Sequence, residues 1–222
     1  MEREVAKSLQ KIGVDTRFVS ITDKKVFINN LKLSKFSRRK EELFKNIFPE
    51  IDVVRSKIFQ KICMRASRNL AHCISPKERI FLNKDGNPAN FTLNTILEPY
   101  KRKYGVEFIF GNDIDEAIGL NVDSIALPIT LDDEAENILN SIINGQKIDL
   151  ISSNNAKGSK KLIYPLVNVP RSWIHSWRGI KTEISHERSY DSAEDLLLFL
   201  ENLIPDVREN LFKSGLFLQK SC

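Results

Sequence analysis

The sequence has few cysteines and no long apolar segment. Its three cysteines, at positions 63, 73 and 222, form no Cys-x-x-Cys pair, so we expect neither a zinc site nor a disulfide framework. No apolar run approaches the roughly 18 residues that a transmembrane helix needs. The start, Met1-Glu2-Arg3-Glu4, has charges of both signs and no apolar stretch behind it, unlike a secretory signal. These absences predict a cytoplasmic protein with reduced thiols, no bound metal and no membrane partner.

The composition that remains is that of an ordinary globular protein. Hydrophobic residues make up 41% and charged residues 28% of the 222 positions. A chain of this length buries a sizeable core without disulfides or metal. It suits one α/β domain with an N-terminal extension, or two small domains.

Positive charge is concentrated in the first third of the chain. Residues 1–78 hold 18 of the 34 lysines and arginines but 9 of the 29 acidic residues, which gives +9 against −4 for residues 79–222. A basic face of this kind suits nucleic acid, although a solvated helix surface would show the same excess. The densest run, which has phenylalanines interleaved, predicts an RNA-binding surface. Its residues are Lys24, Lys25, Lys32, Lys35, Arg38, Arg39, Lys40 and Lys45.

Residues 1–75 are predicted to form a small basic α+β module. Two runs rich in β-branched and aromatic residues, 17–21 and 25–28, predict strands. Apolar residues at helical spacing predict helices at 5–12, 37–48 and 51–73.

Residues 76–222 show a different pattern, in which strands and helices alternate. The expected strands are 79–82, 106–110 and 124–129. The expected helices are 92–104, 113–118, 131–143, 170–177, 192–202 and 205–212, and the polar stretch 152–161 reads as a flexible loop. Short apolar strands separated by helices predict an α/β domain with a parallel sheet and flanking helices.

Four segments within about residues 55–215 carry a recognisable pattern in a fixed order. They are 85–90 (Asp-Gly-Asn-Pro-Ala-Asn), 131–136 (Leu-Asp-Asp-Glu-Ala-Glu), 164–170 (Tyr-Pro-Leu-Val-Asn-Val-Pro), and 200–205 (Leu-Glu-Asn-Leu-Ile-Pro) followed by 209–214 (Glu-Asn-Leu-Phe-Lys-Ser). Together they resemble the PP-loop ATP pyrophosphatases of the adenine nucleotide alpha hydrolase superfamily, in the branch that 2-thiolates tRNA. The resemblance implies a PP-loop, HUP-like fold for residues 76–222.

The segment 85–90 departs from the family's Ser-Gly-Gly-x-Asp-Ser loop, in which glycines let backbone N–H groups approach a pyrophosphate. Only Gly86 matches, the family's metal-holding aspartate corresponds to Ala89, and Pro88 has no N–H to offer. The resemblance implies ATP with Mg²⁺ as the nucleotide, but the altered loop leads us to assign no cofactor. The residues of this degenerate nucleotide site would be Asp85, Gly86, Asn87, Asn90, Asp132 and Asp133.

Other family features have changed as well. The Gly-His that precedes Leu131 in the family is Pro128-Ile129 here, and both the N-terminal zinc ribbon and the mid-domain Cys-x-x-Cys are missing. This combination predicts a non-catalytic paralogue that binds tRNA and works with a catalytic PP-loop partner in a hetero-oligomer. It would resemble the non-catalytic subunit of the cytoplasmic tRNA wobble-uridine 2-thiolation complex. The alternatives are an active ATP-dependent tRNA sulfurtransferase with a divergent loop, and a protein-interaction domain without RNA.

Three further groups of residues leave alternatives open. Trp177 lies between His175 and His186, near arginines, which suits base stacking with phosphate contact but equally a core tryptophan. Asp132 and Asp133 would either touch a nucleotide or cap the helix that follows Thr130. Cys63 and Cys73, with His72 beside the latter, would form a metal or thiol site or be structural thiols, and their spacing of ten favours the structural interpretation.

Overall fold

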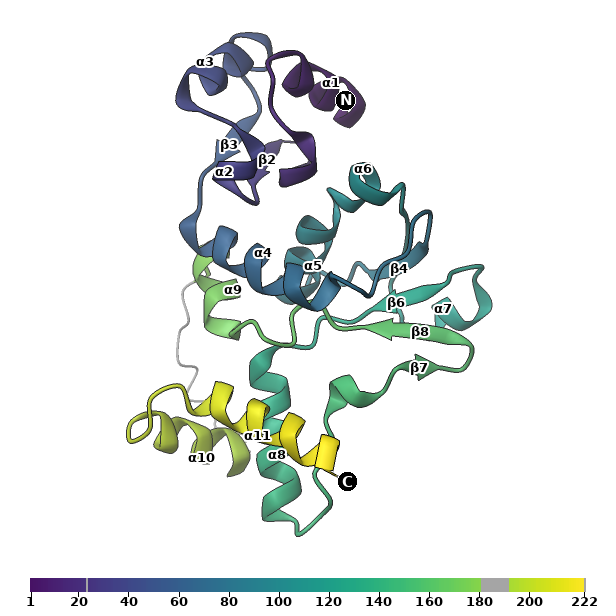
Figure 1. Ribbon diagram of the computed structural model, residues 1–222, viewed down its shortest axis with the longest axis vertical. Helices are drawn as coiled ribbons and strands as arrows, with labels where there is room; N and C mark the ends of the chain where they lie inside the picture. The colour runs from purple at the N-terminus through teal and green to yellow at the C-terminus, as the bar shows by residue number, and fades with distance from the viewer. Residues whose placement is uncertain (23, 181–191, 222) are drawn as a thin grey trace.

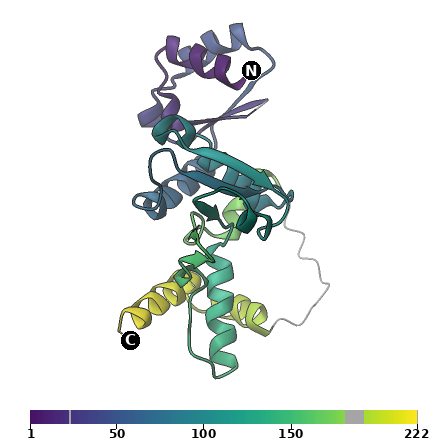
Figure 2. The same ribbon diagram turned by 90° about the vertical axis from the view of Figure 1, so that its right-hand side faces the viewer.

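The protein is described by a computed structural model over residues 1–22, 24–180 and 192–221, with the side chains of Ser192 and of residues 220 and 221 left aside (Figure 1). The described residues form a three-stranded and a five-stranded sheet. The smaller sheet and its helices lie at one end of the molecule, the larger sheet lies in the middle, and the last helices lie at the other end (Figure 2). No helix among the described residues is long and apolar enough to cross a membrane.

The N-terminal unit is built around β2, which pairs antiparallel with β1 and parallel with β3. Its elements are α1 (Glu2–Lys11), η1 (Thr16–Phe18), β1 (Val19–Ile21), β2 (Lys25–Ile28), α2 (Leu31–Ser34), α3 (Arg38–Ile47) and β3 (Asp52–Val54). A separate apolar cluster fills it, with Leu9, Phe36, Phe44 and Ile51 fully buried. The expected helix over 51–73 is therefore wrong at its start, because the β-branched pair at 53–54 completes this sheet.

The large sheet confirms the expected parallel arrangement. Its order is β5-β4-β6-β8-β7, formed by β4 (Arg79–Asn83), β5 (Glu107–Gly111), β6 (Ser124–Ala126), β7 (Ala156–Lys157) and β8 (Lys160–Ile163). The strands β4, β5, β6 and β8 run parallel, and β7 alone is antiparallel to its neighbour. The stretch 152–161 is thus not a flexible loop: it contains β7 and the start of β8, joined by a turn in which Gly158 has a φ of +61°.

Helices cover the sheet and extend the chain beyond it. They are α4 (Lys57–Leu70), α5 (Pro88–Leu97), α6 (Tyr100–Tyr104), α7 (Glu116–Gly119), α8 (Leu131–Ile143), η2 (Ile151–Ser153), α9 (Arg171–Arg178), α10 (Ser192–Glu201) and α11 (Val207–Ser221). The expected helix 92–104 is two helices separated by Pro99, and it begins earlier because Asn87 caps α5 and Pro88 occupies its first position.

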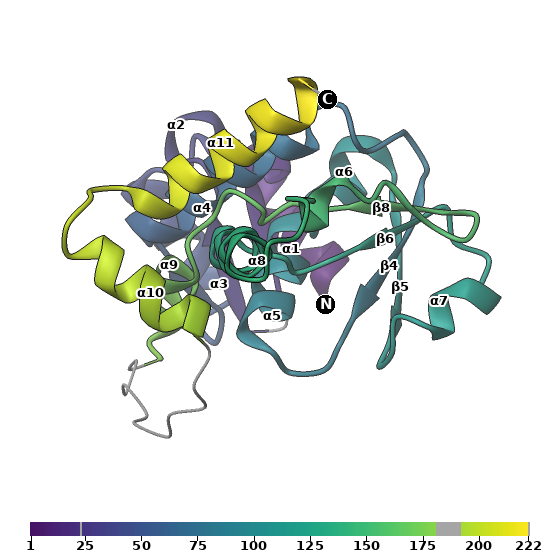
Figure 3. The same ribbon diagram turned by 90° about the horizontal axis from the view of Figure 1, so that it is seen from below.

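Three hydrophobic clusters stabilise the part of the molecule that contains the large sheet and the C-terminal helices. One face of the sheet packs on α4, α5 and α9 through residues such as Phe59, Leu82 and Leu93, and the other face packs on α7 around Phe81. A third cluster joins α8 to α10 and α11, which lie beside it in Figure 3. The helix α4 belongs to the main core although it precedes residue 76, and the division of the chain at 75/76 stays a prediction.

Candidate functional site

The turn after β4 lies where an open parallel sheet offers a ligand site. From β4 the chain passes to β5 on one side and then to β6 on the other, so the carboxyl end of β4 is a topological switch point. Asp85, Gly86, Asn87 and Asn90 lie at this point, and their role in binding a nucleotide stays a prediction. Gly86 has a φ of +80°, a conformation that glycine adopts without steric cost.

Asp85 organises this turn from the inside. One of its carboxylate oxygens accepts hydrogen bonds from the Asn87 N–H at 2.9 Å and from the Asn90 amide nitrogen at 2.8 Å. The other oxygen accepts from the Asn83 amide nitrogen at 3.3 Å. The Asn87 side chain in turn accepts from the Ala89 N–H at 2.8 Å. Two backbone donors that a phosphate would use are therefore occupied, and a carboxylate stands in the turn, which opposes binding of an anion there.

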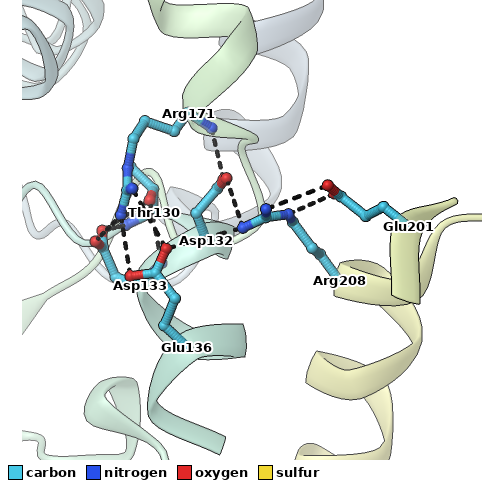
Figure 4. Close-up of polar contacts among 7 residues, drawn as sticks. All are labelled: Thr130, Asp132, Asp133, Glu136, Arg171, Glu201 and Arg208. Atoms are coloured by element: carbon cyan, nitrogen blue, oxygen red, sulfur yellow. Dashed lines mark hydrogen bonds and ion pairs between the residues drawn. The ribbon is translucent and has the colours of Figure 1, made fainter. Parts of the chain in front are cut away.

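Asp132 and Asp133 form a second polar cluster at the start of α8 (Figure 4). Asp133 and Thr130 cap the helix reciprocally: the Thr130 N–H donates to the Asp133 carboxylate at 2.6 Å, and the Asp133 N–H donates to the Thr130 hydroxyl at 3.4 Å. Asp132 accepts from the Arg171 N–H at 2.6 Å and pairs with Arg208 at 3.0 Å. Within the described residues neither carboxylate bonds to the turn at 85–90, so capping and ion pairing account for both of them.

Two arginines partly compensate the negative charge of this helix start and connect it to α9 and α11. Arg171 pairs with Asp133 at 2.7 Å, and Arg208 reaches both Asp132 and Glu201. Burial acts to lower the pKa of Arg171, but Glu136 and Asp133 outweigh it and raise that pKa. Burial also raises the pKa of Glu136, against the opposing pull of Arg171. The cluster is a network of ion pairs in which two arginines connect four carboxylates on neighbouring helices.

Trp177 is half-buried and packs against the main core. Its ring centroid is 4.7 Å from that of Phe59, 5.4 Å from Phe27 and 5.9 Å from Phe91, and its indole N–H donates to the Thr92 hydroxyl at 3.1 Å. These contacts favour the interpretation of Trp177 as a packing residue of the core over that of a free platform for base stacking. His186, the second histidine of that interpretation, lies outside the described residues.

The predicted RNA-binding cations lie at both ends of β2 and on α2 and α3. Lys24 and Lys25 precede or open β2, and the remaining six follow it. Three of the eight are engaged within the protein. Lys40 donates to the carbonyls of Gly13 and Lys35, Lys45 pairs with Asp52, and Arg38 pairs with Glu41. Lys24, Lys25, Lys32, Lys35 and Arg39 are exposed, and none has a carboxylate at ion-pair distance among the described residues.

Neither of the two described thiols, Cys63 and Cys73, belongs to a group of metal-ligating side chains in the described part of the chain. Cys63 is buried, and burial raises the pKa of its thiol, which opposes the thiolate form that metals bind. Cys73 is half-buried, and among the described residues no three histidine, cysteine or acidic side chains gather as metal ligands would. An iron–sulfur cluster is held by several cysteine thiolates. The two described cysteines do not fit such a cluster, because they do not gather with other ligands and burial disfavours the thiolate of Cys63.

The α/β fold, with its mostly parallel sheet and flanking helices, is similar to that of a tRNA thiolase of known structure. The chain superposes on the U34-tRNA thiolase NcsA from Methanococcus maripaludis, whose structure holds a 4Fe-4S cluster, with a TM-score of 0.55. The superposition covers 78% of this chain and 83% of that one at 13% sequence identity, so the likeness is one of fold.

The sequence itself is similar to a curated protein of an archaeon. Over 94 residues it is 29% identical to a probable sulfurtransferase from Methanocaldococcus jannaschii, a match that covers 41% of this chain. The match spans only 28% of the relative's length. The sequence matches no established family model.

Proposed function

We propose that this chain is a tRNA-binding, non-catalytic component of wobble-uridine 2-thiolation, which acts in the cytoplasm together with a catalytic PP-loop partner. A thiolase-like fold and a sequence match to a probable sulfurtransferase support the thiolation context. The turn after β4 carries the non-catalytic part of the proposal. There Asp85, Asn87 and Pro88 occupy or remove the donors that would hold a pyrophosphate.

The first prediction concerns activity. With ATP, Mg²⁺ and tRNA, the purified chain should release no pyrophosphate above a protein-free control, because the turn offers a carboxylate instead of an anion cradle. A coupled pyrophosphate assay measures this. If pyrophosphate release depends on tRNA and is abolished in Gly86→Val, the chain is an active sulfurtransferase and the non-catalytic proposal fails.

The second prediction concerns tRNA binding. Reversing three exposed cations, in the triple variant Lys32→Glu, Lys35→Glu and Arg39→Glu, should weaken tRNA binding about tenfold or more at 0.1 M salt. Each lost phosphate contact also removes counterion release, so the slope of log affinity against log salt should fall by about 2–3. Filter binding over a salt series measures both quantities. Lys40 is left unchanged, because its ammonium group holds two backbone carbonyls.

A matched control reverses three exposed lysines outside the N-terminal unit, Lys77, Lys147 and Lys213. It makes the same change in net charge, and its tRNA affinity should stay close to that of the unaltered protein. Equal loss in the two triple variants would show a general charge effect and no defined RNA surface. Failure of the unaltered protein to bind tRNA would favour the alternative of a protein-interaction domain.

A further inference from the structure

A pocket of about 450 Å³ opens between the N-terminal unit and the large sheet. Ile21 and Thr22, at the end of β1, form one side, and Asn90 and Asn94 on α5 form another. Phe108 and Phe110 of β5 face it, and Asn83, Lys84 and Gly86 bring the turn after β4 to its edge. The pocket thus draws on both parts of the chain.

Three amide oxygens of residues that line this pocket have no hydrogen-bond donor among the described residues. They belong to Asn83, Asn90 and Asn94: the three oxygens are buried, and the whole of Asn90 is only 2% exposed. Asp85 fixes two of them, because it accepts from the amide nitrogens of Asn83 and Asn90 and so directs their oxygens away from itself. Buried acceptors are almost always satisfied in folded proteins, since an unpaired acceptor destabilises the fold. The grouping therefore indicates a ligand with N–H donors.

The rim of the pocket carries aromatic rings with a cation over each. The Arg178 guanidinium lies 3.8 Å from the Phe91 centroid, Lys84 lies 5.9 Å from that of Phe110, and Lys101 lies 5.7 Å from that of Phe108. Rings of this kind stack on planar bases, and nearby cations contact the phosphates that accompany them.

The two carboxylates that line the pocket, Glu2 and Glu98, each have a cationic partner. Glu98 accepts a hydrogen bond from Arg102 at 2.7 Å and another from the Ile21 N–H at 2.9 Å. Glu2 lies 3.9 Å from the ammonium group of Lys101. Glu98 and Glu2 are thus paired with cations, and the negative charge of Asp85 in the adjoining turn favours a base at this end of the pocket over a phosphate.

A second pocket, of about 430 Å³, continues from the first. It shares Thr22 and Phe91 with the first pocket, and Lys24, Lys25, Trp177 and Arg178 also line it. Lys24, Lys25 and Arg178 are exposed. We call the two pockets together the interdomain groove: a base-sized apolar hollow with amide acceptors, followed by a cationic path.

We propose that the interdomain groove binds single-stranded RNA and that the first pocket receives a base with an exocyclic amino group. Cytosine, adenine and guanine present such a group to the amide oxygens, whereas uracil has only its ring N–H as a donor. Lys24, Lys25 and Arg178 would then contact the phosphates of the neighbouring nucleotides. The inference rests on the proposed function, because it takes RNA as the ligand. It adds the place on the protein where the RNA binds and the kind of base that the first pocket receives.

The test uses the full chain and fluorescently labelled octaribonucleotides of cytidine, adenosine or uridine, followed by anisotropy. The cytidine and adenosine strands should bind about tenfold or more tightly than the uridine strand. Asn94→Leu should abolish this preference, because it removes an acceptor without disturbing Asp85. Asn94→Asp, which keeps the acceptor oxygens, should retain it. Lys24→Glu with Lys25→Glu should weaken all three strands alike and flatten the salt dependence.

Several results would overturn the proposal. If all three strands bind equally, or if the preference survives in Asn94→Leu, the first pocket does not recognise a base. If free CMP or AMP competes as effectively as the unlabelled octamer, the pocket binds a free nucleotide, and the proposal that it binds single-stranded RNA is wrong. If tRNA binds normally and Asn94→Leu changes nothing, the groove fails but the proposed function stands. If no RNA binds, both fail. Circular dichroism of each variant confirms that it folds.

Discussion

Replacing Trp177 by alanine is expected to lower the free energy of unfolding by about 3 kcal/mol, the lower end of the range for large aromatic residues removed from cores, because the indole is half-buried against the core. The indole packs against Phe59 at 4.7 Å and Phe27 at 5.4 Å between centroids. Its N–H group also satisfies the Thr92 hydroxyl. Because Phe27 belongs to β2 and Phe59 to α4, the ring connects the N-terminal sheet to the main core. Urea unfolding followed by circular dichroism measures the loss.

Trp173 provides the matched control on the same helix. Like Trp177 it is half-buried, but its ring contacts cations: the Arg65 guanidinium lies 4.4 Å and the Lys61 ammonium group 5.6 Å from its centroid. Trp173→Ala is expected to cost only about 1 kcal/mol, since cation–π contacts at the surface are modest. If Trp177→Ala left stability unchanged and instead abolished RNA binding, the indole would be a stacking platform and its assignment to the core would be wrong.

The sequence predicts those elements whose signals are local. The helix expected at 131–143 has those bounds in α8, because Thr130 and Asp133 form a capping box that is visible in the sequence. The three strands expected from 79 onwards lie side by side and parallel, since apolar runs separated by helices permit little else.

Elements that depend on distant neighbours escaped prediction. The strand β8 begins with Lys160 and Lys161, which suggested a loop, yet it lies between β6 and β7, and each lysine finds an oxygen partner. The strand β3 is short and preceded a helical pattern, and only its pairing with β2 makes it a strand. In both cases tertiary pairing outweighs local propensity.

The candidate site shows the same limit. The turn at 85–90 was located from the sequence, but the role of Asp85 as a common acceptor for Asn83, Asn87 and Asn90 depends on side-chain positions. The eight basic residues could be found by counting, whereas the engagement of Lys40 with backbone carbonyls could not. Thr22 and Asn94 both line the interdomain groove although they are far apart in the sequence, and residue spacing alone does not predict that they lie close together.

The network of ion pairs between α8, α9 and α11 should be the most sensitive polar feature of the fold. Its central contact is the ion pair between Arg208 and Asp132, with an N–O distance of 3.0 Å and with side chains 12% and 11% exposed. Arg208 also contacts Glu201 at 2.6 Å, and burial acts to lower the pKa of Arg208, but its carboxylate partners raise that pKa. The charged form of this arginine is thus the one that the fold requires.

Arg208→Ala is therefore expected to lower the free energy of unfolding by about 3 kcal/mol, because removing one member of a largely buried pair leaves the carboxylates without compensation. Arg17→Ala is the control: Arg17 pairs with Asp15 at 2.8 Å, but its side chain is 60% exposed, and surface pairs contribute below about 1 kcal/mol. Thermal and urea unfolding of both variants measure the difference. The added variant Arg208→Ala with Asp132→Asn should recover part of the loss, since it removes one of the uncompensated charges. Equal, small effects in the two single variants would show that α11 is held by its apolar contacts alone and that the charges at its start are incidental.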